Sequence, residues 1–191
     1  MKNSLKIAAL GLGLVLVSLK ACSLSNGAID GEVLDQSTKK PVAGAIVVVT
    51  WIGDVSKLVD SGSTCYHVET ARTDANGKYH IPGWWSSSVN FSISVRPPSA
   101  DVYKPGYTRP RIDSTLRSIL IAPFVGAKDE YFDSLSAIAG SNSCSGGGTS
   151  RRKLSLLYDA MTEENSIAET PSQKQKIDFI RYQAKDVLVG N

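Results

Sequence analysis

The chain has 191 residues and carries 21 basic and 18 acidic side chains, a formal net charge of +3. Three of the basic side chains, Lys2, Lys6 and Lys20, lie in the first 21 residues, where no acidic residue occurs. The rest of the chain is therefore electrically balanced, which gives no support for a nucleic-acid partner. That remainder is long enough for one domain with a core of its own.

Residues 1–21 have the pattern of a secretory signal peptide. Two lysines precede a nearly continuous apolar stretch, Ile7–Leu19, which is shorter than the about 20 residues that a membrane-spanning helix needs. The stretch ends in Leu19-Lys20-Ala21-Cys22, which resembles the lipobox of bacterial lipoproteins, although Lys20 departs from that pattern. The resemblance implies cleavage before Cys22 and lipidation of that cysteine. An ordinary cleaved signal with a cysteine nearby is the alternative.

A lipid on Cys22 would hold the protein at a membrane of the cell envelope. Two or three acyl chains, such as palmitate, anchor a protein firmly, whereas a single chain is marginal. Ser23 follows the cysteine, where an aspartate would resemble an inner-membrane retention signal. We therefore expect the outer membrane, facing the periplasm, in a Gram-negative cell. Residues 22–28 are mostly small or polar, which predicts a short tether.

The chain has three cysteines, an odd number for a secreted protein. If Cys22 carries the lipid, Cys65 and Cys144 remain, and the periplasm is oxidising. We therefore predict a disulfide between Cys65 and Cys144 that fastens the C-terminal part to a sheet. If Tyr66 and Val68 face the core, alternation along the strand places Cys65 on the outward face. Buried free thiols are the alternative.

Residues 29–125 show the short, regularly spaced strand patterns of an antiparallel β-sandwich. The segment 45–51 is a continuous, mostly β-branched run, typical of a strand buried on both faces. Asn76-Gly77 favours a tight turn, because both residues readily take positive φ. Further strands are predicted at 29–34, 64–73, 78–81, 89–95 and 115–122.

Residues 126–191 change to helical periodicity, which predicts a helical C-terminal extension. Apolar residues recur at helical spacing over 129–139, with Gly140 as the expected end, and again over 154–161. The Gly/Ser-rich segment 140–150 is a flexible connection between these helices. Thr170-Pro171-Ser172-Gln173 matches a capping box, with Thr170 as the cap and Gln173 reaching back, so the last helix is expected to begin at Pro171.

The predicted sandwich contains four segments with a distinctive order and spacing: Asp30–Asp35, Lys40–Val49, Thr73–Ile81 and Lys104–Tyr107. Together they resemble the carboxypeptidase regulatory-like domain, a transthyretin-like (prealbumin-type) β-sandwich. The resemblance implies that fold for residues 29–125. In that family the module stands beside catalytic domains, so by analogy it implies an accessory or binding role here.

Few residues are candidates for catalysis or metal binding. Cys65, His67 and Glu69 alternate along one predicted strand and would share a face, so a zinc site that also uses His80 can be imagined. Two histidines are few for such a site, and Cys65 is expected in the disulfide. We therefore predict no metal and no other cofactor. The sequence has no Gly-x-Ser-x-Gly motif, and we assign no catalytic residue.

Trp84 and Trp85, together with Trp51, are candidates for stacking on the sugar rings of an envelope glycan. The other interpretation is that at least one of Trp84 and Trp85 closes the end of the sandwich. We favour burial of one of the pair, because tryptophan is usually largely buried.

These patterns predict a non-enzymatic, lipid-anchored cell-envelope protein with a binding or structural accessory role. The alternatives are an immunity or inhibitor lipoprotein, an envelope glycan-binding module, and an enzyme. An enzyme would need a pocket that joins His67 or His80 to a carboxylate. The expected partners are the membrane, through the lipid anchor, and a protein or glycan of the envelope.

Overall fold

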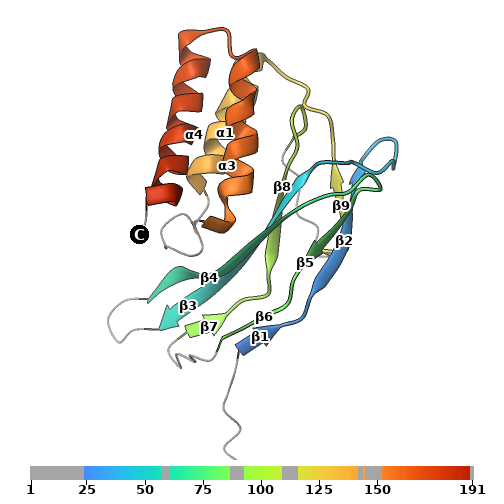
Figure 1. The fold of residues 1–191 in the computed structure, drawn as a ribbon, viewed down its shortest axis with the longest axis vertical. Helices are drawn as coiled ribbons and strands as arrows, with labels where there is room; N and C mark the ends of the chain where they lie inside the picture. Colours follow the sequence, from blue (N-terminus) through green and yellow to red (C-terminus); the bar gives the residue numbers. More distant parts are fainter. Residues whose placement is uncertain are drawn as a thin grey trace, which may run out of the picture.

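A computed structural model describes residues 24–56, 61–86, 93–108, 116–141, 144 and 152–189. These residues are mostly β, with a helical C-terminal part. The predicted signal peptide and Cys22 lie outside the described residues. In Figure 1, the helices gather at one end of the long axis, and the first strand lies at the other end.

The strands form a sandwich-like arrangement of mixed sheets. One sheet has the strand order β5 (Lys78–Ile81), β2 (Ile29–Asp35), β9 (Ser118–Ile121). The other is built on β3 (Ile46–Ser56), which pairs with β4 (Ser61–Arg72) on one side and with β7 (Ile93–Val95) and β8 (Ser99–Tyr103) on the other. β1 (Leu24–Asn26) and β6 (Trp84–Ser86) form a separate antiparallel pair.

The sequence predicted an antiparallel sandwich, and the structure departs from that prediction in one strand pair. β2 and β9 run parallel, with Val33 opposite Ile119 and Asp35 opposite Ile121. Sequence periodicity is the same for both kinds of pairing, because it reports which face is buried and carries no strand direction.

Strand β3 separates two cores. Val47, Val49 and Trp51 face the first sheet and are buried with side chains such as Val33 and Ile81. Ile46 and Val48 point the other way and are buried among helical side chains. The prediction of a strand buried on both faces is confirmed, and the molecule has three layers: sheet, sheet and helices.

Three strands, β1, β6 and β8, were not predicted. β8 lies between Pro97-Pro98 and Pro105, and these prolines made the segment resemble a loop. β1 falls within the predicted tether 22–28, which is therefore partly ordered by its pairing with β6. Of the strand predicted at 89–95, β7 covers Ile93–Val95, and residues 89–92 lie outside the described part.

The turn at Asn76-Gly77 joins β4 to β5 as predicted. Gly77 has φ +70°, and a Cβ there would lie 2.7 Å from the carbonyl oxygen of Val33. The carboxylate of Asp74 accepts hydrogen bonds from the backbone N–H groups of Asn76 and Lys78, at 2.8 and 2.9 Å. Glycine is thus required here both by conformation and by the close approach of β2.

The helical layer contains α1 (Lys128–Ser141), α3 (Ser155–Thr162), the 3₁₀ helix η1 (Glu163–Ile167) and α4 (Pro171–Val189). α1 continues one residue past Gly140, which had been predicted as its end. The capping box is confirmed: Gln173 N–H donates to Thr170 Oγ1 at 3.2 Å, and Gln173 Oε1 accepts from Thr170 N–H at 3.3 Å. None of the helices in the described ranges has the length and apolar character to cross a membrane.

Candidate functional site

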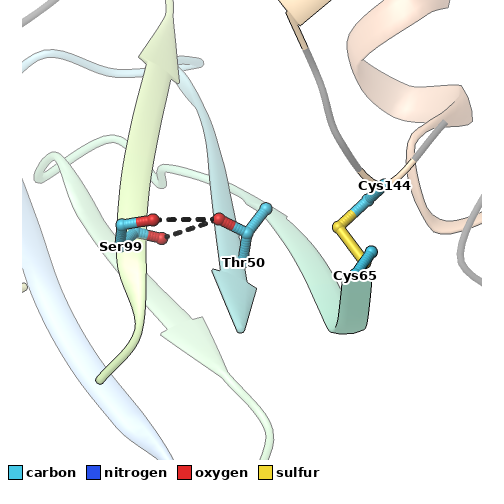
Figure 2. Close-up of a disulfide and its surroundings, with 4 residues drawn as sticks. All are labelled: Thr50, Cys65, Ser99 and Cys144. Atoms are coloured by element: carbon cyan, nitrogen blue, oxygen red, sulfur yellow. Dashed lines mark hydrogen bonds between the residues drawn. A yellow bond between two sulfur atoms is a disulfide. The ribbon is translucent and has the colours of Figure 1, made fainter. Parts of the chain in front are cut away.

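A disulfide joins Cys65 on β4 to Cys144 in the connection after α1, as predicted (Figure 2). The two Cα atoms are 4.9 Å apart, within the range that a disulfide spans. Cys144 is fully buried and Cys65 is partly buried against the same helix-side core. The bond therefore fastens the helical layer to the second sheet.

Cys65 lies on the outward, helix-covered side of the second sheet, as expected, but its neighbours on β4 do not follow simple alternation. A β-bulge between Trp51 and Ile52 pairs Trp51 with His67 and Ile52 with Cys65, so Tyr66 is an extra residue on β4. Cys65 consequently lies on the helix side together with Val68, and His67 lies on the inner side with Trp51. The expectation that Cys65 and His67 share one face is wrong for this reason.

A buried polar contact connects the same layers at a second point. Glu164 of η1 is only 7% exposed, and its Oε1 accepts hydrogen bonds from the hydroxyls of Tyr103 on β8 and Tyr131 on α1, at 2.8 and 2.7 Å. Burial raises the pKa of both phenols, so they remain protonated donors. The network joins η1, β8 and α1, so we interpret it as a structural contact that stabilises the packing of the helices on the sheet.

Trp84 and Trp85 do not form a shared platform. They are consecutive on β6 and so point to opposite faces of the strand. Trp84 packs against the inter-sheet core, where its ring lies 5.6 Å from Trp51 and stacks on His67 at 4.5 Å. Trp85 is 72% exposed, whereas Trp51 is fully buried. These three residues therefore do not present the pair of exposed, coplanar rings that stacking on a glycan needs. Trp84 is the member of the pair that packs at the end of the sandwich.

Two adjoining cavities, of about 770 and 240 Å³, form an open cleft at the end of the sandwich where β1 lies. We call it the β1 cleft. Both cavities are lined by Asn26, Pro97 and Pro98. Asp30 and Arg117 line the larger cavity, whose other walls are Ala28, Ile29 and Leu116. The smaller is lined by Trp51, Trp84, Val95 and Arg96.

The smaller cavity is lined by two tryptophans whose indole nitrogens are buried. The Nε1 atoms of Trp51 and Trp84 are buried, and neither has a hydrogen-bond partner among the described residues. Arg96 adds a guanidinium, although it is already paired with Asp54 through Nε at 2.8 Å. The cavity walls are therefore mainly apolar, with Arg96 as the charged group among the described lining residues, a composition typical of small-molecule sites.

Each of the two histidines lies beside a carboxylate. His67 Nε2 lies 2.9 Å from Glu69 Oε1, and burial lowers the pKa of His67 against the opposing effect of that hydrogen bond. His80 Nδ1 lies 2.7 Å from Asp30 Oδ1 on the exposed face of β2 and β5. Asp30 borders the β1 cleft, and the described residues that line the cleft include no serine, threonine or cysteine as a nucleophile.

No cluster of three or more histidine, cysteine, aspartate or glutamate side chains in the described ranges could hold a metal ion. The residues considered for a zinc site do not come together: Cys65 is in the disulfide on one side of β4, and His67 lies on the other side.

Comparison of the chain with family models, with curated proteins and with solved structures gave no match.

The β1 cleft was not predicted from the sequence. Its lining comes from segments that are up to 91 positions apart, between Asn26 and Arg117. The sequence feature that could have indicated this cleft is the pair Pro97-Pro98, which lines both cavities and has no backbone N–H groups.

Proposed function

We propose that this chain is a non-enzymatic, lipid-anchored protein of the cell envelope with a binding or structural accessory role. One observation carries the proposal: with Cys65 joined to Cys144, Cys22 is the remaining cysteine of three. It follows a secretory pattern and the Leu19-x-Ala21 context, and a single residue, Ser23, separates it from β1. Outer-membrane attachment facing the periplasm in a Gram-negative cell is part of the proposal.

We propose further that the sandwich is transthyretin-like, as in carboxypeptidase regulatory-like domains. Its support is local: the characteristic segments form the turn at Gly77 and the positive-φ bend at Gly44, with φ +69°. Gly31, in the first segment, lies so close to Tyr79 and the Leu116 carbonyl that a Cβ would meet both. The parallel pairing of β9 is outside the antiparallel pattern first expected.

The accessory role is best supported at the β1 cleft. Its tryptophan and proline walls, together with the guanidinium groups of Arg96 and Arg117, favour binding of a small molecule that carries acceptor or anionic groups. Attachment near β1 would keep this end of the sandwich close to the membrane surface.

The test of the anchor is mass spectrometry of the mature N-terminus, isolated from cells that express the full chain. We expect a chain that begins at Cys22 and carries acyl chains. Cys22→Ser is expected to abolish acylation and to move the protein out of the membrane fraction, and Ser23→Ala is the matched control that keeps both. A mature protein with an unmodified Cys22, or cleavage at another position, would reject the proposal.

A further inference from the structure

Trp85 exposes a large apolar surface at one defined place in the fold. It is 72% exposed at the centre of β6, with its side chain on the face of the strand opposite to Trp84. Of the three tryptophans, Trp51 is buried and Trp84 packs against the core, so Trp85 alone faces outward. An indole combines an apolar body with a polar N–H, which suits the boundary between water and lipid.

The chain connectivity brings Trp85 close to Cys22. Consecutive Cα atoms are about 3.8 Å apart, so the Cα of Leu24 lies at most about 7.6 Å from that of Cys22, and the Cα of Ser25 at most about 11 Å. Ser25 is directly opposite Trp85 in the β1–β6 pair. Facing residues in such a pair are about 5 Å apart, so the Cα of Trp85 lies within about 17 Å of that of Cys22.

We infer that the β1–β6 end of the sandwich docks on the bilayer, with Trp85 inserted at the level of the lipid headgroups; this inference rests on the proposed lipidation of Cys22. The occupant of this surface is the membrane itself. The headgroup region of each leaflet is about 5–8 Å thick. The short covalent path keeps Trp85 within about 17 Å of the anchor, so the headgroup layer is within its reach at a high effective concentration and one indole suffices where it would not bind alone.

Docking at β1 also fixes the orientation of the molecule. β1 and β6 lie at one end of the long axis and α1, α3 and α4 gather toward the other (Figure 1). The helical layer would then point away from the bilayer, with the Cys65–Cys144 disulfide holding it on the sheet.

The experiment measures the depth of Trp85 in the acylated full-length product. The protein is extracted from membranes, its acylation is verified by mass spectrometry, and it is reconstituted into phosphatidylethanolamine–phosphatidylglycerol vesicles with or without acyl chains brominated near the headgroup. Bromine quenches indole emission only at short range. Trp85→Phe is compared with wild type, because phenylalanine keeps an aromatic ring at this exposed position and removes only the indole emission.

We expect brominated vesicles to quench the wild-type protein and to leave Trp85→Phe nearly unquenched, because Trp51 and Trp84 face inward. With three tryptophans in the chain, the quenched share is expected to be on the order of one third of the emission. Equal quenching of acylated wild type and acylated Trp85→Phe would overturn the inference and leave the proposed anchor intact. Absence of acyl chains on Cys22 would overturn the anchor and the inference together.

Discussion

Removal of the Cys65–Cys144 disulfide tests how the helical layer is held on the sheet. The bond closes a loop with a sequence separation of 79 residues. In the chain-entropy treatment, a loop of this length raises the free energy of unfolding by about 4.5 kcal/mol, because the unfolded chain loses that much conformational freedom. We expect Cys65→Ala/Cys144→Ala to lose about 3–4.5 kcal/mol, which corresponds to a fall in Tm of about 10 °C for a chain of this size.

The assay is urea unfolding of the mature chain with Cys22→Ser, so that no third thiol interferes. Circular dichroism follows the helices and tryptophan emission follows the sandwich, where Trp51 and Trp84 lie. Hydrogen exchange is expected to increase first in α1 and α3, because Cys144 is buried in their core. Dithiothreitol should reproduce the shift in the chain with both cysteines and should have no effect on the double variant.

Two results would refute this reasoning. Thiol titration of the denatured, unreduced Cys22→Ser chain is expected to find no free thiol, and two thiols would show that the bond is not formed. A double variant within 1 kcal/mol of the parent, at the level of an ordinary substitution, would show that the bond does not constrain the unfolded chain as argued.

Four further predictions concern single side chains. Ile180→Ala should lower the free energy of unfolding by about 2–5 kcal/mol, since Ile180 is fully buried, while the exposed Gln175→Ala on the same helix changes it by less than about 0.5 kcal/mol in urea melts. Thr170→Ala should cost about 1 kcal/mol through loss of the α4 cap; an unchanged urea midpoint contradicts this. Burial raises the pKa of Tyr79 to about 12, so its contribution to stability is present below pH 10 and is lost as pH rises toward 12; alkaline melts of Tyr79→Phe should show a shallower decline. Burial lowers the pKa of His67, so its contribution is present above about pH 6.5 and is lost as pH falls below that value; an NMR titration giving His67 a pKa above 6.5 would disprove this.

Features that depend on neighbouring residues were predictable from the sequence. The capping box at Thr170 and Gln173 lies within one helical turn, so the residue types alone specify its hydrogen bonds. The Asp74–Gly77 turn is similar, because Gly77 accepts a positive φ that other residues resist. The double burial of β3 was visible as an uninterrupted β-branched run, and the disulfide followed from cysteine counting.

Features that depend on partner strands were decided only by the tertiary structure. The bulge opposite Trp51 is a property of the register between β3 and β4, and it moved Cys65 and His67 to opposite sides. The parallel direction of β9, the inclusion of β8 despite its flanking prolines, and the lining of the β1 cleft arise in the same way. The sequence by itself determined the strand and helix periodicities and the caps, because these are set by local geometry, and it indicated the cysteine pair because two cysteines remain once Cys22 is assigned to the lipid. Strand direction, register and the exposure of Trp85 were decided by contacts between distant segments, which local pattern does not encode.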